Sequence, residues 1–308
     1  MTSRTMSSKV KRIIVIAAVL AAFVVAVVFI AGAMINAGAS MQRHAASVSV
    51  TDDYGRVVAV PAHPSRVVSL SPAVTEIMFA LGAQDLLVGR TDFCVYPPEA
   101  EHIPSIGGIS NLNIERILSL KPDLVVSGSM VGKKVTDQMD AMGTPMVCVI
   151  EKPHFDALYD NILAIGRLVD KEHEADSLNA LLRDRVSQLP TTHYPLPTMY
   201  YVVGFGPAGN FTAGGNTFIN DIIRMAGGRN IAEDVEGWSY SLEALVKADP
   251  DYIIVRREDS AAFCSMKPYN TLRAVRGGNV IGIESGTFDL QVPRNIDAVL
   301  YLRSRIHQ

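Results

Sequence analysis

The chain has 308 residues, of which 48% are hydrophobic, and its formal net charge is −3. A length of this order favours two lobes over one small core. The nearly neutral charge offers no basic surface for phosphate backbones, so a nucleic-acid partner is not expected. The three cysteines, Cys94, Cys148 and Cys264, contain no CxxC pair and are too few for a disulfide framework, which argues against a structural zinc site.

Basic residues open the N-terminus, and an uncharged run from Ile13 to Ile35 follows them. About 20 apolar residues suffice to span a bilayer as a helix, and the preceding cations are expected to stay in the cytoplasm. Residues 1–40 are therefore predicted to be a cytoplasmic stub and a membrane segment, with the rest exported. The run exceeds the roughly 7–15 apolar residues of a cleavable signal. Ala37-Gly38-Ala39 nevertheless suits a signal peptidase, so a retained anchor and a cleaved signal both stay open.

Residues 41–65 are predicted to be a tether followed by a β-hairpin, because VSVTDDYGRVVAV alternates apolar and polar residues around a turn. From residue 66 to residue 153, short apolar strands alternate with helices. RVVSL, DLVVS and MVCVI are the predicted strands, and TEIMFALG and NIERILSL are two of the predicted helices. This alternation predicts an α/β lobe with a mostly parallel sheet and helices on its faces.

Residues 155–189 keep a helical period of apolar residues, which predicts one helix of about 35 residues and about 50 Å. We expect residues 154–190 to bridge two lobes. Residues 191–308 then repeat the first design, because SLEALVKADPDYIIVR (241–256) follows the order of IERILSLKPDLVVSG (114–128): helix, Pro-Asp, strand. The prediction is two similar α/β lobes joined by one long helix.

Ligands of open α/β sheets bind outside the carboxyl ends of the strands. Two facing lobes would therefore form a ligand cleft between the loops that follow their strands. A single helical connection offers few soft dihedrals, so opening of the cleft is expected to be small. The predicted cleft loops are Ser71-Pro72, 90–105, 127–133, 204–215 and 256–267.

Several segments resemble the helical-backbone substrate-binding proteins of ABC importers, the group that captures cobalamin, ferric siderophores and haem. The segments are RVVSLSPAVTEIMFALGA, GRTDFCVYPPEA, IGGISNLNIERILSLKPDLVV, TAGGNTFINDIIRMAGGRN and VPRNIDAVL. The resemblance covers about residues 48–308, and YPPEA together with NIER is most similar to the cobalamin-binding members. It implies a protein that is no enzyme, needs no cofactor, and delivers a corrinoid to a membrane permease and its ATPase. We expect a monomer.

The resemblance also implies ligand contacts. Phe93 falls where cobalamin-binding relatives place a stacking tyrosine, and Trp238 matches a ligand-facing tryptophan. Aromatic contact contributes about 0.5–1.5 kcal/mol beyond buried area. Two alternatives stay open: an Arg90–Asp92 ion pair, and Trp238 as a core residue. The full set of expected ligand contacts is Arg90, Asp92, Phe93, Tyr96, Phe205, Trp238, Tyr240 and Arg256.

Permease docking is expected at Glu115, because relatives carry an acid at this position of NIER. The matching position of the second lobe is Arg224, a departure from the family pattern, so Asp221 or Glu233 is expected to substitute. Glu76 lies near the start of its helix, where a carboxylate complements the helix dipole.

The alternative functions are of two kinds: other ligands bound by the same fold, and an enzyme. The histidines are scattered along the sequence, so no direct metal-ion site is expected. Ferric siderophore or haem binding is the main alternative. Haem would need an axial ligand, for which Tyr96, Tyr240 and Cys94 are candidates. A disulfide between Cys94 and Cys264 also stays open.

An exported hydrolase is the distant alternative, with Cys94 or Ser71 as nucleophile and Asp92 and His102 as base and orienter. The sequence contains no GxSxG elbow.

Overall fold

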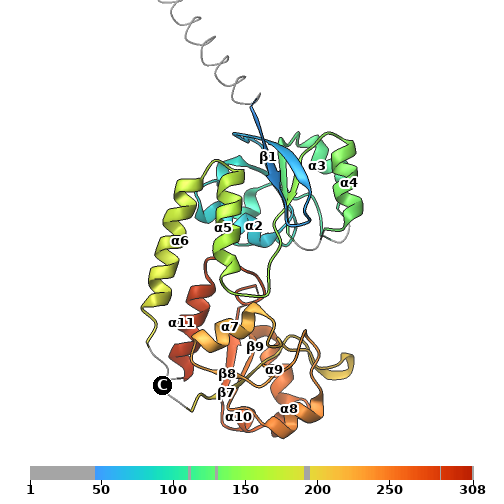
Figure 1. Cartoon of the computed structure of the whole chain (residues 1–308). Helices are drawn as coiled ribbons and strands as arrows, with labels where there is room; N and C mark the ends of the chain where they lie inside the picture. Colours follow the sequence, from blue (N-terminus) through green and yellow to red (C-terminus); the bar gives the residue numbers. More distant parts are fainter. Residues whose placement is uncertain (1–45, 110–111, 129–130, 191–194, 285, 307–308) are drawn as a thin grey trace, which may run out of the picture. The chain divides into compact units, whose positions relative to one another are not determined.

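The computed structural model describes residues 46–109, 112–128, 131–190, 195–284 and 286–306 (Figure 1). The predicted membrane segment Ile13–Ile35 lies outside them. Within these ranges, no helix has both the length and the apolar character that crossing a membrane requires. The chain divides into two compact units: residues 1–48 with 61–63, and residues 49–60 with 64–308. The two four-stranded sheets and the sites described below belong to the second unit.

The predicted hairpin is confirmed. Strands β1 (Ser47–Thr51) and β2 (Val57–Pro61) form a two-stranded sheet. In the turn, the amide of Gly55 donates to the carbonyl of Asp52 at 2.8 Å, and Gly55 has a φ of 74°. A left-handed φ of this kind is adopted freely by glycine, which explains the residue at this turn.

Two four-stranded parallel sheets form the frame of the second unit, which confirms the predicted α/β fold. The first has the order β4-β3-β5-β6 and the second β10-β9-β7-β8, so both have the same topology when the second is taken from its other edge. The strands of the first are β3 (Val67–Ser69), β4 (Leu87–Arg90), β5 (Leu124–Ser127) and β6 (Met146–Cys148). Those of the second are β7 (Thr198–Tyr201), β8 (Arg229–Asn230), β9 (Tyr252–Arg256) and β10 (Val280–Ile283).

Helices alternate with the strands in both halves of the chain, and glycines or polar side chains define many of their ends. Gly82 and Gly143 follow helices with φ of 66° and 69°, and the side chains of Asn113, Thr217 and Ser241 cap helix N-termini. The helices are α2 (Pro72–Ala80), α3 (Ile114–Ser119), α4 (Lys133–Ala141), α5 (Ala157–Leu168), α6 (Glu172–Ser187), α7 (Phe218–Met225), α8 (Leu242–Ala248), α9 (Arg257–Ser265), α10 (Arg273–Arg276) and α11 (Asn295–Ile306).

The repeated Pro-Asp motif has the same function in both halves. Before β5, the carboxylate of Asp123 accepts a hydrogen bond from the amide of Ser65 at 2.8 Å, at the entry to β3. Before β9, the carboxylate of Asp251 accepts one from the amide of Thr198 at 2.8 Å, at the start of β7. Each aspartate thus fixes the start of the neighbouring strand, so the weak sequence repeat reflects a real structural repeat.

The single long helix predicted for residues 155–189 is wrong. The chain forms two helices, α5 and α6, that pack against each other, with Asp170 between them in a left-handed conformation at φ 59°. The amide of Lys171 donates to the carbonyl of Gly166 at 2.7 Å. A Cβ on Gly166 would lie 2.6 Å from the Cβ of Ala175, so the glycine permits the close approach of α6. The apolar period continued across the break because both helices are amphipathic.

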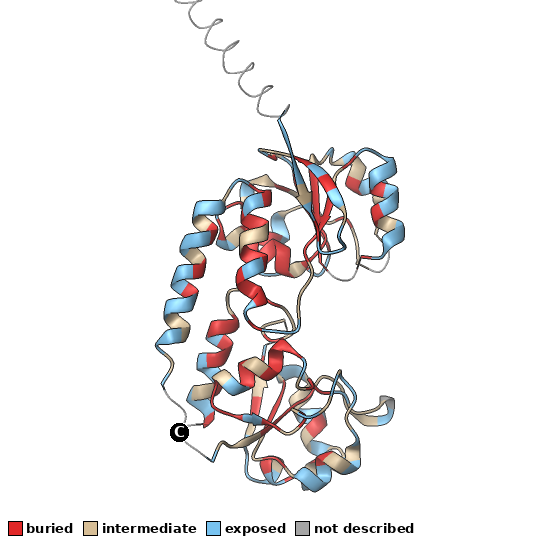
Figure 2. Ribbon diagram, viewed as in Figure 1, coloured by how far each residue is buried: buried red, intermediate tan, exposed pale blue. Residues whose placement is uncertain are grey.

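One continuous apolar core contains residues from both sheets. Val126 of β5 and Ile254 of β9 belong to it, together with apolar side chains of α2, α5, α7 and α11. Two further clusters cover the other faces of the sheets, one under α3 and α4, the other under α8 and α9. Figure 2 shows the strands mainly as buried and much of α6 as exposed. The loops after the strands therefore extend from a rigid, well-packed frame.

Candidate ligand-binding site

Exposed aromatic side chains gather on loops that follow strands. Among the described residues six aromatics are exposed, and four of them lie beyond the carboxyl end of a strand of the two parallel sheets. Phe93 and Tyr96 follow β4, Phe211 follows β7, and Trp238 follows β8. Aromatic rings bury a large area when a ligand covers them, so their gathering at this end of the sheets is informative. These loops, from both sheets, are therefore the best candidates for a ligand-binding surface.

Arg90, an expected ligand contact, instead holds its own loop together. It is 9% exposed, and its guanidinium donates to the carbonyls of Ala100 at 2.8 Å, Thr91 at 3.0 Å and Glu101 at 3.1 Å. Its donors face the backbone, and the alternative ion pair with Asp92 is not what the structure shows. The reason is that the loop returns to β4, which brings carbonyls around the strand's last side chain.

Phe93 is presented to solvent by this fixed loop. Its side chain is 59% exposed. The neighbouring Asp92 is also exposed, yet its carboxylate accepts a hydrogen bond from the hydroxyl of Ser105, and its amide donates to the carbonyl of Gly107 at 3.0 Å. Asp92 thus fastens the base of the loop, and Phe93 is its free apolar group.

The two nucleophiles proposed for hydrolysis are buried. Cys94 is 0% exposed, with its sulfur 3.2 Å from the hydroxyl of Thr91, and Ser71 is 8% exposed at the start of α2. A substrate in solvent does not reach either nucleophile. All three described cysteines have free thiols, so the structure contains no Cys94–Cys264 disulfide.

In the second half, two phenylalanines of the loop after β7 differ in exposure. Phe205 packs edge-on against Phe263 and Tyr269, with ring centroids 5.3 and 5.8 Å apart, and belongs to the apolar cluster of its sheet. Its ring is thus largely engaged within the protein, and its expected role as a ligand contact stays a prediction. Phe211, six residues later in the same loop, is 38% exposed and lies over the backbone of Gly204.

The loop that carries Phe211 pairs with the loop that carries Trp238. Phe211 forms antiparallel bridges with Gly204 and Ser239, and the amide of Thr212 donates to the carbonyl of Trp238 at 2.8 Å. Trp238 is 47% exposed, which excludes the alternative that it is a core residue. The two aromatics thus occupy one hydrogen-bonded surface element.

Two other expected contacts are largely engaged within the protein. The hydroxyl of Tyr240 donates to the carbonyl of Ile231 at 3.2 Å, and its ring lies 5.7 Å from that of Tyr200. Burial raises the pKa of Tyr240. These contacts give Tyr240 a structural role.

Arg256 pairs with Asp289 at 3.0 Å, and the same carboxylate accepts from the hydroxyl of Tyr201 at 2.7 Å. Burial lowers the pKa of Arg256, but the charge of Asp289 outweighs it and the net pKa is raised. The arginine keeps a third of its side chain exposed, and its charge is already compensated.

Glu76 does not complement the dipole of its helix, as was expected; it forms a buried ion pair with Arg294. The Nε of Arg294 lies 2.9 and 3.0 Å from the two carboxylate oxygens, and Glu76 is 5% exposed. Burial raises the pKa of Glu76 to about 7, against the opposing effect of the arginine. The guanidinium also donates to the hydroxyl of Thr287 at 2.9 Å and stands 4.1 Å from the ring centre of Tyr96. Arg294 therefore links α2, the loop after β4 and the loop after β10.

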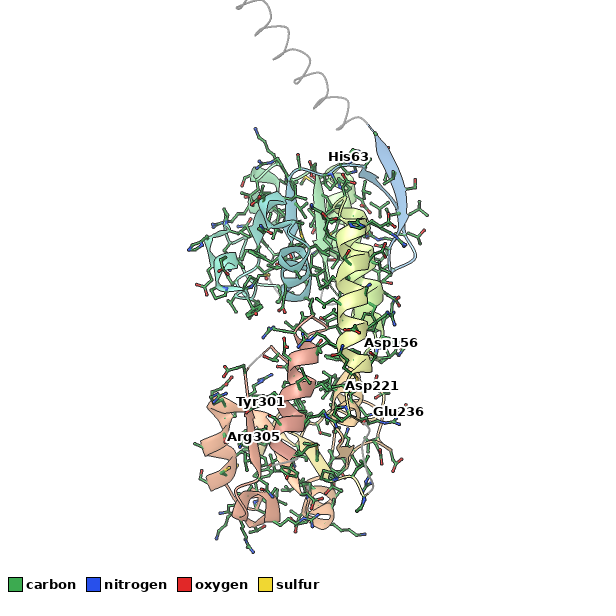
Figure 3. The ribbon with its side chains drawn as sticks, turned by 90° about the vertical axis from the view of Figure 1, so that its left-hand side faces the viewer. His63, Asp156, Asp221, Glu236, Tyr301 and Arg305 are labelled. Carbon is green, nitrogen blue, oxygen red and sulfur yellow. The ribbon has the colours of Figure 1, made fainter. Side chains whose placement is uncertain are left out.

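The predicted docking residues differ in availability. Glu115 is exposed in the first turn of α3, as expected for a docking group. Asp221 is half-buried, and its carboxylate accepts a hydrogen bond from the amide of Phe155 at 2.9 Å. One of its carboxylate oxygens therefore fixes the segment that precedes α5. Asp221 and Asp156 line one surface pocket, together with Arg224 (Figure 3). Glu233 pairs with Arg229 at 3.3 Å.

No group of three or more His, Cys, Asp and Glu side chains is arranged to hold a metal ion within the part of the chain that the structure describes. Of the three candidate axial ligands for haem, Cys94 is buried and Tyr240 is hydrogen-bonded. Tyr96, which is 45% exposed, is the accessible one.

Sequence reasoning missed three residues of this region: Phe211, Arg294 and Tyr301. Phe211 could have been found, because it sits in the same glycine-rich loop as Phe205. Arg294 lies in the segment VPRNIDAVL that carried the resemblance, but its partner Glu76 is 218 residues away. Tyr301 lies on α11 without a distinguishing pattern.

Comparison with known proteins identifies the family of the chain. Residues 67–286 match the family described as periplasmic binding protein. A cobalamin-binding protein from Halobacterium salinarum is 30% identical over 277 residues, which cover 84% of this chain and 74% of the relative. A periplasmic haem-binding protein from Pseudomonas aeruginosa is 26% identical, with a TM-score of 0.70 over 79% of this chain and 92% of that structure.

A protein of an ABC-type Fe³⁺-hydroxamate transport system from Saccharomonospora viridis shares the fold. It is 24% identical, with a TM-score of 0.70 over 85% of this chain and 99% of that structure. The family match spans well over half of the chain, and the cobalamin-binding relative extends it. The chain belongs to the periplasmic binding protein family and is a substrate-binding protein of the ABC-importer type.

Proposed function

We propose that the protein captures a corrinoid outside the cytoplasm and delivers it to an ABC permease. The observation that carries this proposal is the set of exposed aromatics on loops of both sheets, namely Phe93, Phe211 and Trp238. A corrinoid has broad, largely apolar faces, and burial of such faces against aromatic rings supplies affinity while a few polar groups fix orientation. The 30% identical relative that is named a cobalamin-binding protein supports the same ligand class.

Binding on this account needs no covalent step. The loops after β4, β7 and β8 would contact the ligand in a cleft, and the fixed backbones beneath them would limit the entropy lost on binding. Glu115 on α3 is the proposed contact to the permease, with Asp221 as its counterpart. Export would depend on the apolar run Ile13–Ile35, acting as an anchor or as a cleaved signal.

The test of ligand class is a calorimetric titration of the exported part, residues 46–308, with cyanocobalamin, haemin and a ferric hydroxamate. We expect saturable binding of cyanocobalamin at micromolar protein and at least tenfold weaker binding of the other two. Absence of heat with cyanocobalamin would overturn the corrinoid proposal.

Haem is the second candidate, because the phenol of Tyr96 is exposed on the loop after β4. The haem-binding protein from Pseudomonas aeruginosa shares the fold at 26% identity. A Soret band on the purified protein that disappears in Tyr96→Phe would favour haem over a corrinoid. Tryptophan quenching by a ferric hydroxamate, without a response to cyanocobalamin, would favour a siderophore.

A further inference from the structure

A cavity of about 340 Å³ lies where the carboxyl ends of β9 and β10 meet the loop after β4. Its lining combines Tyr96 of that loop with residues that follow β9 and β10 and with the first half of α11. Figure 3 shows Tyr301 on α11, on the other side of this helix from Asp156 and Asp221. The lining residues are Tyr96, Arg257, Gly282, Ile283, Glu284, Thr287, Phe288, Arg294, Asp297, Ala298 and Tyr301.

Two tyrosines form flat walls of the cavity, and both are held in place. The hydroxyl of Tyr301 donates to the carbonyl of Gly282 at 3.0 Å, so its ring has a fixed position although it is 38% exposed. The guanidinium of Arg294 lies 4.1 Å from the ring centre of Tyr96. Buried apolar side chains, Phe288 among them, complete the lining. Such walls suit a flat group that stacks or packs edge-on.

The charged groups of the lining are already paired. Arg257 pairs with Glu284 at 2.9 Å, Arg294 pairs with Glu76, and Asp297 pairs with Arg185. The two arginines and the two carboxylates of the lining balance one another, so the cavity offers an anionic occupant no net attraction. The cavity therefore suits an uncharged group, not a carboxylate such as a haem propionate.

The size of the cavity further limits the occupant. Pockets for drug-sized ligands measure about 300–1,000 Å³, and about 340 Å³ lies at the lower end of that range. A macrocycle does not fit, but one flat arm of a larger ligand does. Thr287 accepts a hydrogen bond from Arg294 and keeps a hydroxyl proton that it can donate to an acceptor atom of the occupant.

We propose that this cavity binds the heterocyclic base of a complete corrinoid and thereby distinguishes it from corrinoids that lack the nucleotide arm. The inference rests on the proposed function. The base is a flat, uncharged arm of such a molecule, so it matches the walls, the charge balance and the size. Tyr301 and Tyr96 are the specificity-determining residues.

The experiment titrates the wild-type protein and three variants with cobalamin and with cobinamide, which lacks the nucleotide arm. We expect the wild type to bind cobalamin about tenfold more tightly. Tyr301→Ala should lower cobalamin affinity to the level of cobinamide and leave cobinamide binding unchanged. Tyr301→Phe, which keeps the ring, should retain the preference within about twofold. Leu300→Ala is the matched control, because Leu300 is exposed on α11 and does not line the cavity.

Each remaining outcome contradicts the inference. An equal loss for both ligands in Tyr301→Ala, or no loss for either, would show that the cavity does not hold the base. Equal affinity of the wild type for the two ligands would show the same. If the wild type bound neither ligand, the proposed function itself would be wrong, and this inference with it.

Discussion

The loop after β4 and the loop after β8 occupy equivalent places in the two sheets, and different residues hold each of them in place. Each strand ends on a buried polar side chain, Arg90 in the first sheet and Asn230 in the second. Asn230 donates to the carbonyl of Ala213 at 2.8 Å, as Arg90 donates to carbonyls of its own loop. The loop after β4 then exposes two aromatics, Phe93 and Tyr96, and the loop after β8 exposes one, Trp238.

The difference between the loops lies in what supports them. Trp238 rests on strand-like pairing with the neighbouring loop, entirely within the second half. The loop after β4 is also held from outside, because Arg294 of the second half stands against Tyr96. The comparison teaches that a loop after a strand can be fixed either by local backbone pairing or with the help of one long-range arginine. A loop that depends on one distant arginine is more sensitive to a single substitution than a loop held by backbone pairing.

The largest expected effect comes from removing the internal support of the first loop. In Arg90→Ala the carbonyls of Thr91, Ala100 and Glu101 lose a charged donor. Hydrogen bonds to charged groups contribute about 1.5–3 kcal/mol each, and three are lost, so the free energy of unfolding should fall by at least about 4.5 kcal/mol in urea denaturation. The matched control is Arg66→Ala, because Arg66 also donates to carbonyls but is exposed, and it should change stability by less than about 1 kcal/mol. Equal losses in the two variants would show that burial is not the cause.

The long-range support should make stability depend on pH. The pKa of Glu76 is about 7 in the folded protein, against an ordinary value of 4.5. The folded state thus holds the proton more tightly, so this contribution to stability is complete below about pH 4.5 and is lost as the pH rises through 7. At about 1.4 kcal/mol per pKa unit, the loss is about 3 kcal/mol.

Urea midpoints of the wild type and of Glu76→Gln between pH 5 and 8 measure this loss. The wild type should lose stability relative to Glu76→Gln as the pH rises from 5 to 8. Glu243→Gln, on the exposed start of α8, is the control and should run parallel to the wild type. Parallel curves for all three proteins would rule out Glu76 as the titrating group.

A smaller effect separates the two phenylalanines of the loop after β7. Phe205→Ala should cost about 2 kcal/mol of stability, since its ring packs on Phe263 and Tyr269 but is not fully buried. Its corrinoid affinity should stay within about twofold of the wild type. Phe211→Ala should show the reverse pattern: nearly unchanged stability and weaker binding. Thermal unfolding combined with calorimetry distinguishes the two, and a loss of affinity in Phe205→Ala alone would restore the original expectation.

The sequence predicted those features that depend on neighbouring residues. The strands, the helix ends at Gly82 and Gly143 and the two Pro-Asp motifs are local, and the structure confirms them. The break between α5 and α6 was missed because the apolar period continues past Asp170, and only the packing on Gly166 shows why the chain turns there.

The site was predicted less completely, because burial depends on partners far along the chain. Arg90 and Phe205 are residue types that often contact ligands. Arg90 is instead surrounded by carbonyls about ten residues later in the chain, and Phe205 by the rings of Phe263 and Tyr269. Glu76 could not be matched with Arg294 from spacing alone. Phe93 and Trp238 were identified through the resemblance to a family, and the structure adds that both are exposed on equivalent loops.

The measurement that tests the account most directly is a cyanocobalamin titration of Phe93→Ala, Trp238→Ala and the double variant. If both loops hold one corrinoid, each single variant should bind about tenfold more weakly, and the double variant should lose about as much as the two combined. The control is Tyr54→Ala, an exposed aromatic in the hairpin turn, which should bind within about twofold of the wild type. Wild-type affinity in either single variant would contradict the claim that both halves of the protein contact the ligand.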